Sequence, residues 1–263
     1  MLKVEKPKVC LEIANESKAE YVLVVASSAR LLAQTARVAG FKPLVIDLFA
    51  DQDTQYYAHD FKQIISLAKQ HLKPAVDYFI KTYQVDKVVY GSGFEHHPES
   101  LCYLNSCLSL FGNTPEDFID LHDKPAFFAT LKHLAIPYPQ VHFIKPNEFG
   151  GWLIKPMRGQ GGEGIKHYLG EEVAEGTYWQ RYQTGKQYSV LFLADGLQVQ
   201  VVGFNSQWTT CLDGSREFMF SGIINACDLK AEQQSQVVGW LNSLVPLFKL
   251  KGCLLYTSPS PRD

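Results

Sequence analysis

Stretches typical of buried strands alternate with helical stretches over residues 21–120, and this alternation constrains the fold more than any other feature of the sequence. The strand-like stretches are YVLVVA (21–26), KPLVIDLF (42–49) and DKVVYGSGF (86–94). Apolar residues at helical spacing occupy LLAQTARVAG (31–40), the segment 58–84, where Pro74 breaks or starts a helix, and PESLCYLNSCLSLF (98–111). Because parallel strands need long crossover connections, usually helices, this pattern predicts a small α/β domain with a parallel sheet.

The pattern changes after residue 120. Asp123 is typical of a helix N-cap, and we expect a helix over the stretch DKPAFFATLKHLAI that it opens. Short strands joined by brief turns follow, with Asp195–Gly196 as a strong hairpin signal, and residues 230–248 are typical of an amphipathic helix. We therefore expect a second domain over residues 121–252, of α+β class with antiparallel sheets.

The two ends of the chain differ from the rest. Residues 1–20 are polar and lack periodicity, which predicts a loose N-terminal arm. The stretch CLLYTSPSPRD (253–263) matches the in-frame translation of a sequencing-library adapter. We expect residues 1 to about 252 to be the native part of the chain, cut short at its C-terminus, and we leave the tail out of the fold prediction.

Composition narrows the classes of function. The chain has 263 residues, of which 46% are hydrophobic, and a net charge of −2, so no broad basic face indicates a nucleic-acid partner or an anionic membrane. Its longest apolar runs are strand-sized, well below the roughly 20 residues of a membrane span. Six scattered cysteines without a CxxC pair favour reduced thiols, and no secretory signal opens the chain. These features predict a cytoplasmic location.

A glycine-rich segment, LIKPMRGQGGEGI (153–165), is the strongest local motif. Its glycines are Gly159, Gly161, Gly162 and Gly164. It lacks the Gly-Lys-Ser/Thr end of a Walker A loop, and the segment after it alternates like a strand rather than opening a helix. We therefore expect the tip of a β-hairpin whose backbone amides approach phosphate, with Lys155 and Arg158 adding positive charge. The alternative is a plain hairpin tip without a ligand.

Several segments occur in an order that resembles the ATP-grasp superfamily. After the Asp123-Lys124 helix start come the turn IPYPQ, the strand WLIKP, the glycine loop, the strand YWQRYQ and the stretch LFLADG. The resemblance covers residues 21–252. Within the superfamily, VVYGSGFEHHPESL and GNTPE are most similar to a branch of predicted ATP-dependent carboxylate–amine ligases that occur beside one-carbon (methylotrophy) gene clusters.

The resemblance implies roles for particular residues. Lys124 and Lys155 match two lysines that contact nucleotide phosphates, and the segment from Gly159 to Gly164 matches the mobile loop that closes over them. The hinge that borders adenine corresponds to Gln180, Arg181, Tyr182 and Gln183. Gln187 occupies the position where many relatives carry a glutamate that binds the ribose hydroxyls. The glutamine amide can still form a hydrogen bond with a hydroxyl, but it carries no charge.

The resemblance also implies a reaction with ATP and Mg²⁺. A carboxylate attacks the γ-phosphate of ATP, and an amine then displaces phosphate from the acyl phosphate. The two substrates are small molecules, and the sequence does not give the oligomeric state. The family's metal ligands come late, in a Glu-x-Asn motif that is absent before residue 252, so we assign no metal ligands and no catalytic residue. We expect the shortened chain to bind nucleotide weakly and not to turn over.

The first domain offers a candidate substrate contact. Gly91, Gly93 and Glu95 follow a strand end, and open α/β sheets bind ligands at that edge. The alternative is an ordinary surface turn.

Two other functions remain open from the sequence. A nicotinamide-dependent oxidoreductase would use the first domain, although the turn after its first strand, SSAR, has no glycine. A non-catalytic nucleotide-binding or sensing protein would keep the same fold as the ligase.

Overall fold

The computed structural model describes residues 20–148, 150–213 and 216–257, with only the backbone described from 253 to 257. The predicted arm, residues 1–20, therefore lies outside the described residues apart from Glu20. Within the described part, no helix is both long and apolar enough to cross a membrane. The described residues form three sheets, one parallel followed by two antiparallel, and the predicted order of parallel and antiparallel sheets is confirmed.

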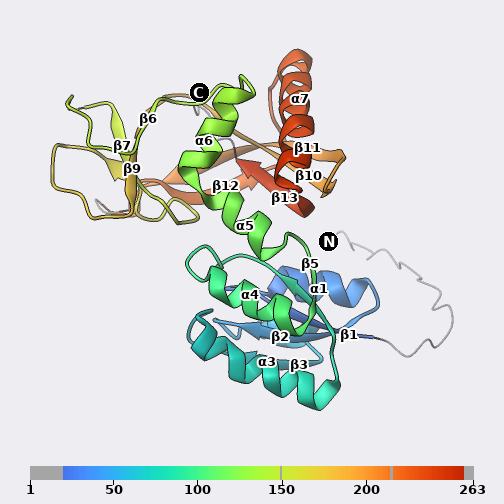
Figure 1. Cartoon of the computed structure of the whole chain (residues 1–263). Helices are drawn as coiled ribbons and strands as arrows, with labels where there is room; N and C mark the ends of the chain where they lie inside the picture. Colours follow the sequence, from blue (N-terminus) through green and yellow to red (C-terminus); the bar gives the residue numbers. More distant parts are fainter. Residues whose placement is uncertain (1–19, 149, 214–215, 258–263) are drawn as a thin grey trace, which may run out of the picture.

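The parallel sheet occupies the first part of the chain and has the strand order β3-β2-β1-β4-β5. Its strands are β1 (Tyr21–Val25), β2 (Lys42–Asp47), β3 (Asp60–Gln63), β4 (Lys87–Tyr90) and β5 (Ser109–Phe111). The helices α1 (Arg30–Val38), α2 (Gln52–Tyr57), α3 (Lys69–Tyr83) and α4 (Pro98–Cys107) connect them. Figure 1 shows this layer at the bottom, in blue to teal.

Alternate residues of β1 enter two different cores, as expected for a strand covered on both faces. Leu23 and Val25 pack in a cluster with residues of α3 and α4. Val22 and Val24 pack in a second cluster that includes Ala33 of α1. The near-continuous apolar run of this strand is explained by burial on both sides.

Two short strands and one proline differ from the sequence prediction. Residues 60–63, expected within a helical stretch, form the edge strand β3 beside β2. Residues 109–111, expected at a helix end, form the other edge strand, β5, beside β4. In both segments, pairing with a neighbouring strand outweighs the local helical pattern. Pro74 neither breaks nor starts a helix, because α3 runs through it and buries Leu72 and Val76 on either side.

Two consecutive helices, α5 (Pro115–His122) and α6 (Lys124–His133), lead from the parallel sheet to the antiparallel sheets. Asp123 lies between them and caps α6, because its side chain accepts a hydrogen bond from the Ala126 amide at 3.0 Å. The predicted N-cap is confirmed.

The two antiparallel sheets have the orders β6-β9-β7-β8 and β12-β11-β10-β13. The first comprises β6 (Val141–His142), β7 (Trp152–Pro156), β8 (Lys166–His167) and β9 (Thr177–Arg181). The second comprises β10 (Gln187–Asp195), β11 (Val199–Thr210), β12 (Met219–Ile224) and β13 (Lys251–Thr257), and α7 (Ala231–Phe248) packs on it. In Figure 1 the second sheet and α7 are orange to red.

The β10–β11 hairpin turns at the predicted position. The Asp195 side chain accepts hydrogen bonds from the amides of Leu197 and Gln198 at 2.9 and 2.7 Å, which fixes the turn. Strand β13 pairs with β10 and includes residues 253–257, part of the segment matched to an adapter. The origin of that segment stays a prediction.

Candidate functional site

The glycine-rich segment forms the tip of an antiparallel hairpin, as predicted. Strands β7 and β8 pair with Leu153 opposite His167 and Ile154 opposite Lys166, so residues 157–165 form the connection. A strand follows the glycines, where a Walker A loop or a dinucleotide fingerprint would place a helix. The segment can therefore offer backbone amides to an anion, but no helix N-terminus.

This loop rests on the start of β12. The Phe220 amide donates a hydrogen bond to the carbonyl oxygen of Gly161 at 2.8 Å. Gly162 has φ +85°, and a Cβ added there would lie 1.8 Å from the carbonyl oxygen of Phe218. Only glycine can occupy this position without moving the backbone, because both the φ angle and the close approach exclude a side chain.

Lys155 extends from the strand that leads into the loop. Its Nζ donates a hydrogen bond to Oε1 of Gln180 at 3.2 Å and lies 5.9 Å from the centre of the Tyr178 ring. Strands β7 and β9 pair with Lys155 opposite Tyr178 and Leu153 opposite Gln180, which places these side chains on one face of the sheet. The pairing of the two strands thus brings the loop lysine to the predicted hinge.

A cavity between the two antiparallel sheets, here called the sheet cavity, collects five predicted nucleotide residues. Its lining is Leu153, Lys155, Ile165, Gln180, Tyr182, Gln183, Gly185, Gln187, Thr209 and Phe218. The predicted residues among them are Lys155, Gln180, Tyr182, Gln183 and Gln187. Arg181 lies apart, because its guanidinium donates to the Gly150 carbonyl and lies 5.3 Å from the Trp152 ring. Alternation along β9 directs its side chain to the opposite face.

Two aromatic residues that line the sheet cavity, Tyr182 and Phe218, pack against the His167 ring. The His167 ring lies 4.9 Å from the Tyr182 ring and 5.3 Å from the Phe218 ring, centre to centre. The sequence prediction missed Phe218, as well as Thr209 on β11, because these residues lie far along the chain from the glycine loop. No local motif marks either position.

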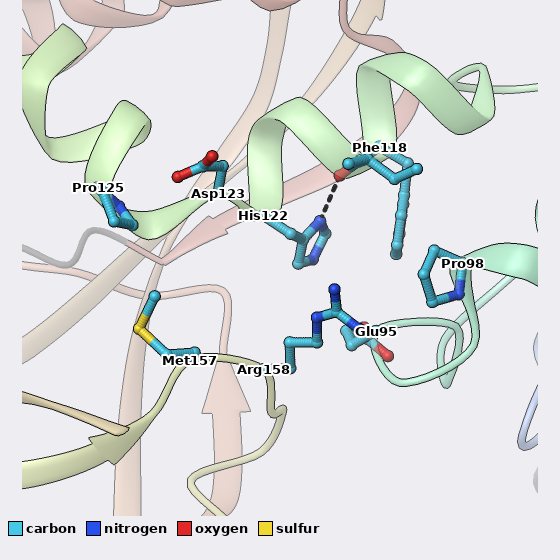
Figure 2. Close-up of a pocket in the computed structure, with 9 residues that line it drawn as sticks. Glu95, Pro98, Phe118, His122, Asp123, Pro125, Met157 and Arg158 are labelled. Carbon is cyan, nitrogen blue, oxygen red and sulfur yellow. Dashed lines mark hydrogen bonds between the residues drawn. The ribbon is translucent and has the colours of Figure 1, made fainter. Parts of the chain in front are cut away.

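A second cavity, here called the junction cavity, lies where the parallel sheet, α5, α6 and the glycine loop meet. Its volume is about 400 Å³, and its lining is Glu95, Pro98, Phe118, Ile119, His122, Asp123, Pro125, Met157 and Arg158. It brings together Glu95, a predicted substrate residue, and Arg158, a predicted nucleotide residue (Figure 2). Arg158 thus lines a different cavity from Lys155, three residues earlier.

The glycines before Glu95 have packing roles. A Cβ at Gly91 would lie 2.9 Å from Ala26 Cβ, and a Cβ at Gly93, which has φ +105°, would lie 2.7 Å from the Leu67 side chain. The Gly93 amide also donates to Oε2 of Glu95 at 3.0 Å, which orients the carboxylate. These glycines permit a tight turn that carries Glu95 to the junction cavity.

Lys124 is half-buried beside the junction cavity, between the lining residues Asp123 and Pro125. Burial lowers the pKa of Lys124 from its ordinary value, and the negative charge of Glu95 opposes this effect. One turn along α6, the Phe128 ring lies 6.0 Å from the Tyr178 ring, over which Lys155 extends. Lys124 thus lies next to the junction cavity and is not among the residues that line the sheet cavity with Lys155. The convergence of the two lysines on one phosphate group stays a prediction.

His122, at the end of α5, is a further polar residue of the junction cavity that the sequence prediction missed. Its Nδ1 bonds to the Phe118 carbonyl at 2.7 Å, and its ring stacks on the Phe118 ring at 4.2 Å (Figure 2). In the sequence it is an isolated histidine within DLHD, and only the fold shows that it lines a cavity.

The helix that follows β1 is capped by protein atoms. The Ala29 amide, at the N-terminus of α1, donates to Oδ2 of Asp47 at 3.5 Å, and the fully buried Asp47 also accepts from the Ala50 amide. A dinucleotide phosphate would bind at such a helix N-terminus. A buried carboxylate there argues against the oxidoreductase alternative.

The described residues contain no group of three or more His, Cys, Asp or Glu side chains that could hold a metal ion. They therefore give no protein ligand set for the Mg²⁺ that the resemblance implies.

Comparison with known proteins identifies the second part of the chain. A model of the ATP-grasp domain (ATP-grasp_3) matches residues 121–254. No curated protein sequence gives a significant match.

Solved structures share the fold at low identity. N5-carboxyaminoimidazole ribonucleotide synthetase from Thermotoga maritima has a TM-score of 0.63 at 16% identity, over 89% of this chain and 63% of that one. L-amino acid ligase from Bacillus licheniformis has a TM-score of 0.65 at 14% identity, over 89% of this chain and 61% of that one. Pyruvate carboxylase from Rhizobium etli has a TM-score of 0.70 at 14% identity, over 93% of this chain and 26% of that one. The chain spans less than two thirds of the length of each of these three proteins.

Proposed function

Because the chain belongs to the ATP-grasp domain family, we propose that it is part of an ATP-dependent carboxylate–amine ligase. In this reaction ATP converts a carboxylate into an acyl phosphate, and an amine displaces the phosphate to form an amide. Both substrates are small molecules. The activity is proposed for the whole protein.

The observation that carries this proposal is the convergence in the sheet cavity. Lys155, Gln180, Tyr182, Gln183 and Gln187 come from three strands and a connection, and they line one cavity together with Ile165, at the end of the glycine loop. An ammonium, neutral amides and an aromatic ring are groups that suit a triphosphate, a purine edge and a ribose.

Each of these groups has a specific role in the proposal. Lys155 neutralises phosphate charge, and the amides of the glycine loop bond to phosphate oxygens. Gln180 and Gln183 bond to the purine edge, against which the Tyr182 ring packs. Gln187 bonds to a ribose hydroxyl without charge.

Gly162 holds the glycine loop against the segment before β12, since a Cβ there would meet the Phe218 carbonyl. Magnesium has no protein ligand set among the described residues, so no step is assigned to it.

The junction cavity is the proposed site of the acid and the amine. It borders Met157 and Arg158, which directly follow the strand that carries Lys155. A carboxylate held by Arg158 there would be next to the loop that holds the terminal phosphate. Glu95 offers the opposite charge for an ammonium group.

Thermal unfolding with different ligands tests the proposal. ATP with magnesium is expected to raise the melting temperature of the full-length protein, and NAD is expected to leave it unchanged. Stabilisation by NAD alone would refute the proposal. ATP binding without ADP release, in the presence of mixed small carboxylates and hydroxylamine, would instead support the non-catalytic nucleotide-binding alternative.

A further inference from the structure

The junction cavity contains a histidine whose hydrogen bonding fixes its tautomer. Nδ1 of His122 lies 2.7 Å from the Phe118 carbonyl oxygen, which can only accept, so Nδ1 carries the proton. The other ring nitrogen, Nε2, has no hydrogen-bond partner among the described residues. When the ring is neutral, Nε2 therefore presents a lone pair.

Figure 2 shows one edge of this ring bonded to the Phe118 carbonyl and the rest of the ring facing Arg158 and Glu95 across the cavity. The stack on Phe118 at 4.2 Å and the Nδ1 bond hold it in place. Nε2 is therefore held on the side of the ring that faces the cavity.

We propose that His122 is the general base that accepts a proton from the attacking amine, a role that rests on the ligase function proposed above. An amine substrate is mostly protonated near neutral pH and cannot attack until it loses a proton. A neutral imidazole with a fixed tautomer suits this step.

Burial, more than the surrounding charges, favours the neutral form of the ring. Burial lowers the pKa of His122 from its usual value, and the charges of Lys124 and Arg158 act in the same direction. The Phe118 hydrogen bond and the charge of Glu95 oppose these effects. Lys124 belongs to α6, Arg158 to the glycine loop and Glu95 to the β4–α4 connection, while Asp123 follows His122 directly. The net effect leaves a base that is unprotonated at neutral pH.

Two carboxylates also line the cavity: Asp123, which caps α6 by accepting the Ala126 amide, and Glu95, whose position suits another task. Oε2 of Glu95 already accepts the Gly93 amide, and a carboxylate is ordinarily a much weaker base than imidazole. The charge of Glu95 can then serve the substrate in another way. This charge can hold the incoming ammonium while His122 removes the proton.

The substrate ammonium gives one proton to Nε2 of His122, and the nitrogen lone pair forms the C–N bond with the acyl carbon. The C–O bond to phosphate breaks, and its electron pair goes to the phosphate oxygen. The second proton leaves the nitrogen with the phosphate, as hydrogen phosphate. ATP has supplied the phosphoryl group in the preceding step.

Nitrogen-15 NMR of the full-length protein tests the state of the ring without a substrate. The signal is assigned by its loss in His122→Asn. The expected result at pH 7 is a protonated Nδ1 and an unprotonated Nε2. A positively charged ring, or a proton on Nε2, would overturn the proposal.

Two kinds of nucleophile, amines and hydroxylamine, then test whether His122 acts as a base in catalysis. The carboxylate substrates in the assay are a mixture of the common amino acids and small mono- and dicarboxylates. The amino acids in this mixture also supply the protonated amines. Hydroxylamine is largely unprotonated at neutral pH and needs no base. His122→Asn, whose amide can still donate to the Phe118 carbonyl, is expected to lower the amine-dependent rate of ADP release by about 10²-fold or more. The hydroxylamine-dependent rate is expected to stay within about threefold, and added imidazole is expected to restore part of the amine-dependent rate.

The outcomes separate the two proposals. An equal loss with both nucleophiles would mean a structural role for His122 and would overturn the base assignment alone. If the unchanged protein forms no hydroxamate, the ligase proposal fails, and the base assignment fails with it. His133→Asn, an exposed histidine on α6, is the matched control and is expected to change neither rate.

Discussion

Nζ of Lys155 and Oε1 of Gln180 are 3.2 Å apart, which joins the strand before the glycine loop to the first residue of the predicted hinge. This contact crosses from β7 to the neighbouring strand β9, so the ammonium is held within the sheet cavity. A phosphate group bound there would meet a positive charge already held in place.

Lys155→Ala is expected to weaken ATP binding by about 10- to 100-fold, because a hydrogen bond to a charged group is worth roughly 1.5–3 kcal/mol. Isothermal titration with ATP and magnesium measures the effect. Lys166→Ala is the matched control, since Lys166 pairs with Glu171 in the connection after β8 and does not line the cavity. Equal affinities in the two variants would show that Lys155 does not bind the nucleotide.

Gly162→Ala tests whether the observed position of the glycine loop matters. The added Cβ would lie 1.8 Å from the Phe218 carbonyl oxygen, so the loop must move away from β12. We expect at least tenfold weaker ATP binding with little change in melting temperature. Gly161→Ala is the control, because Gly161 also has positive φ, at +63°, but a Cβ there meets nothing within 4 Å. Similar losses in both variants would attribute the effect to backbone strain alone.

His122 is expected to make stability depend on pH on the acidic side of neutrality. Its folded pKa is lowered, chiefly by burial, so the unfolded chain binds the proton more readily. The contribution is fully present above the unfolded pKa of about 6.5 and is lost as pH falls through the folded value. Urea unfolding between pH 5 and 7 should show a shallower pH dependence in His122→Asn. The exposed His133→Asn should keep the full slope, and an unchanged slope in His122→Asn would contradict the burial argument.

The sequence predicts the elements whose signals are local. The apolar run of β1, the N-cap Asp123, the Asp195–Gly196 turn and the hairpin around the glycine loop each depend on residues a few positions apart. Edge strands β3 and β5 escaped prediction because they are short and are stabilised by pairing with strands distant in sequence.

In the candidate site, too, contacts between residues distant in sequence could not be predicted. Family resemblance supplied the strand and loop residues of the sheet cavity, and five of them do lie together. The resemblance did not predict Phe218 as a lining residue. It also did not predict that Glu95, His122 and Arg158 line one cavity, because their proximity depends on how α5 and the glycine loop pack. Arg158 was grouped with Lys155 by closeness in sequence, yet the chain directs the two side chains into different cavities.

Asn113→Ala is expected to loosen the connection between the parallel sheet and the second antiparallel sheet. The buried Asn113 accepts the Lys251 amide through Oδ1 at 2.7 Å, and its own carbonyl accepts the Tyr90 hydroxyl at 3.0 Å. Removing the side chain leaves a backbone amide without its partner, at a cost of about 1–3 kcal/mol. Chemical unfolding should show this loss, whereas Asn242→Ala on the exposed face of α7 should unfold like the unchanged protein. If Asn113→Ala were as stable as that control, the hydrogen bond between Asn113 and Lys251 would not stabilise the arrangement of the two sheets. The shape of the junction cavity would then depend on the packing of α5 and α6 alone.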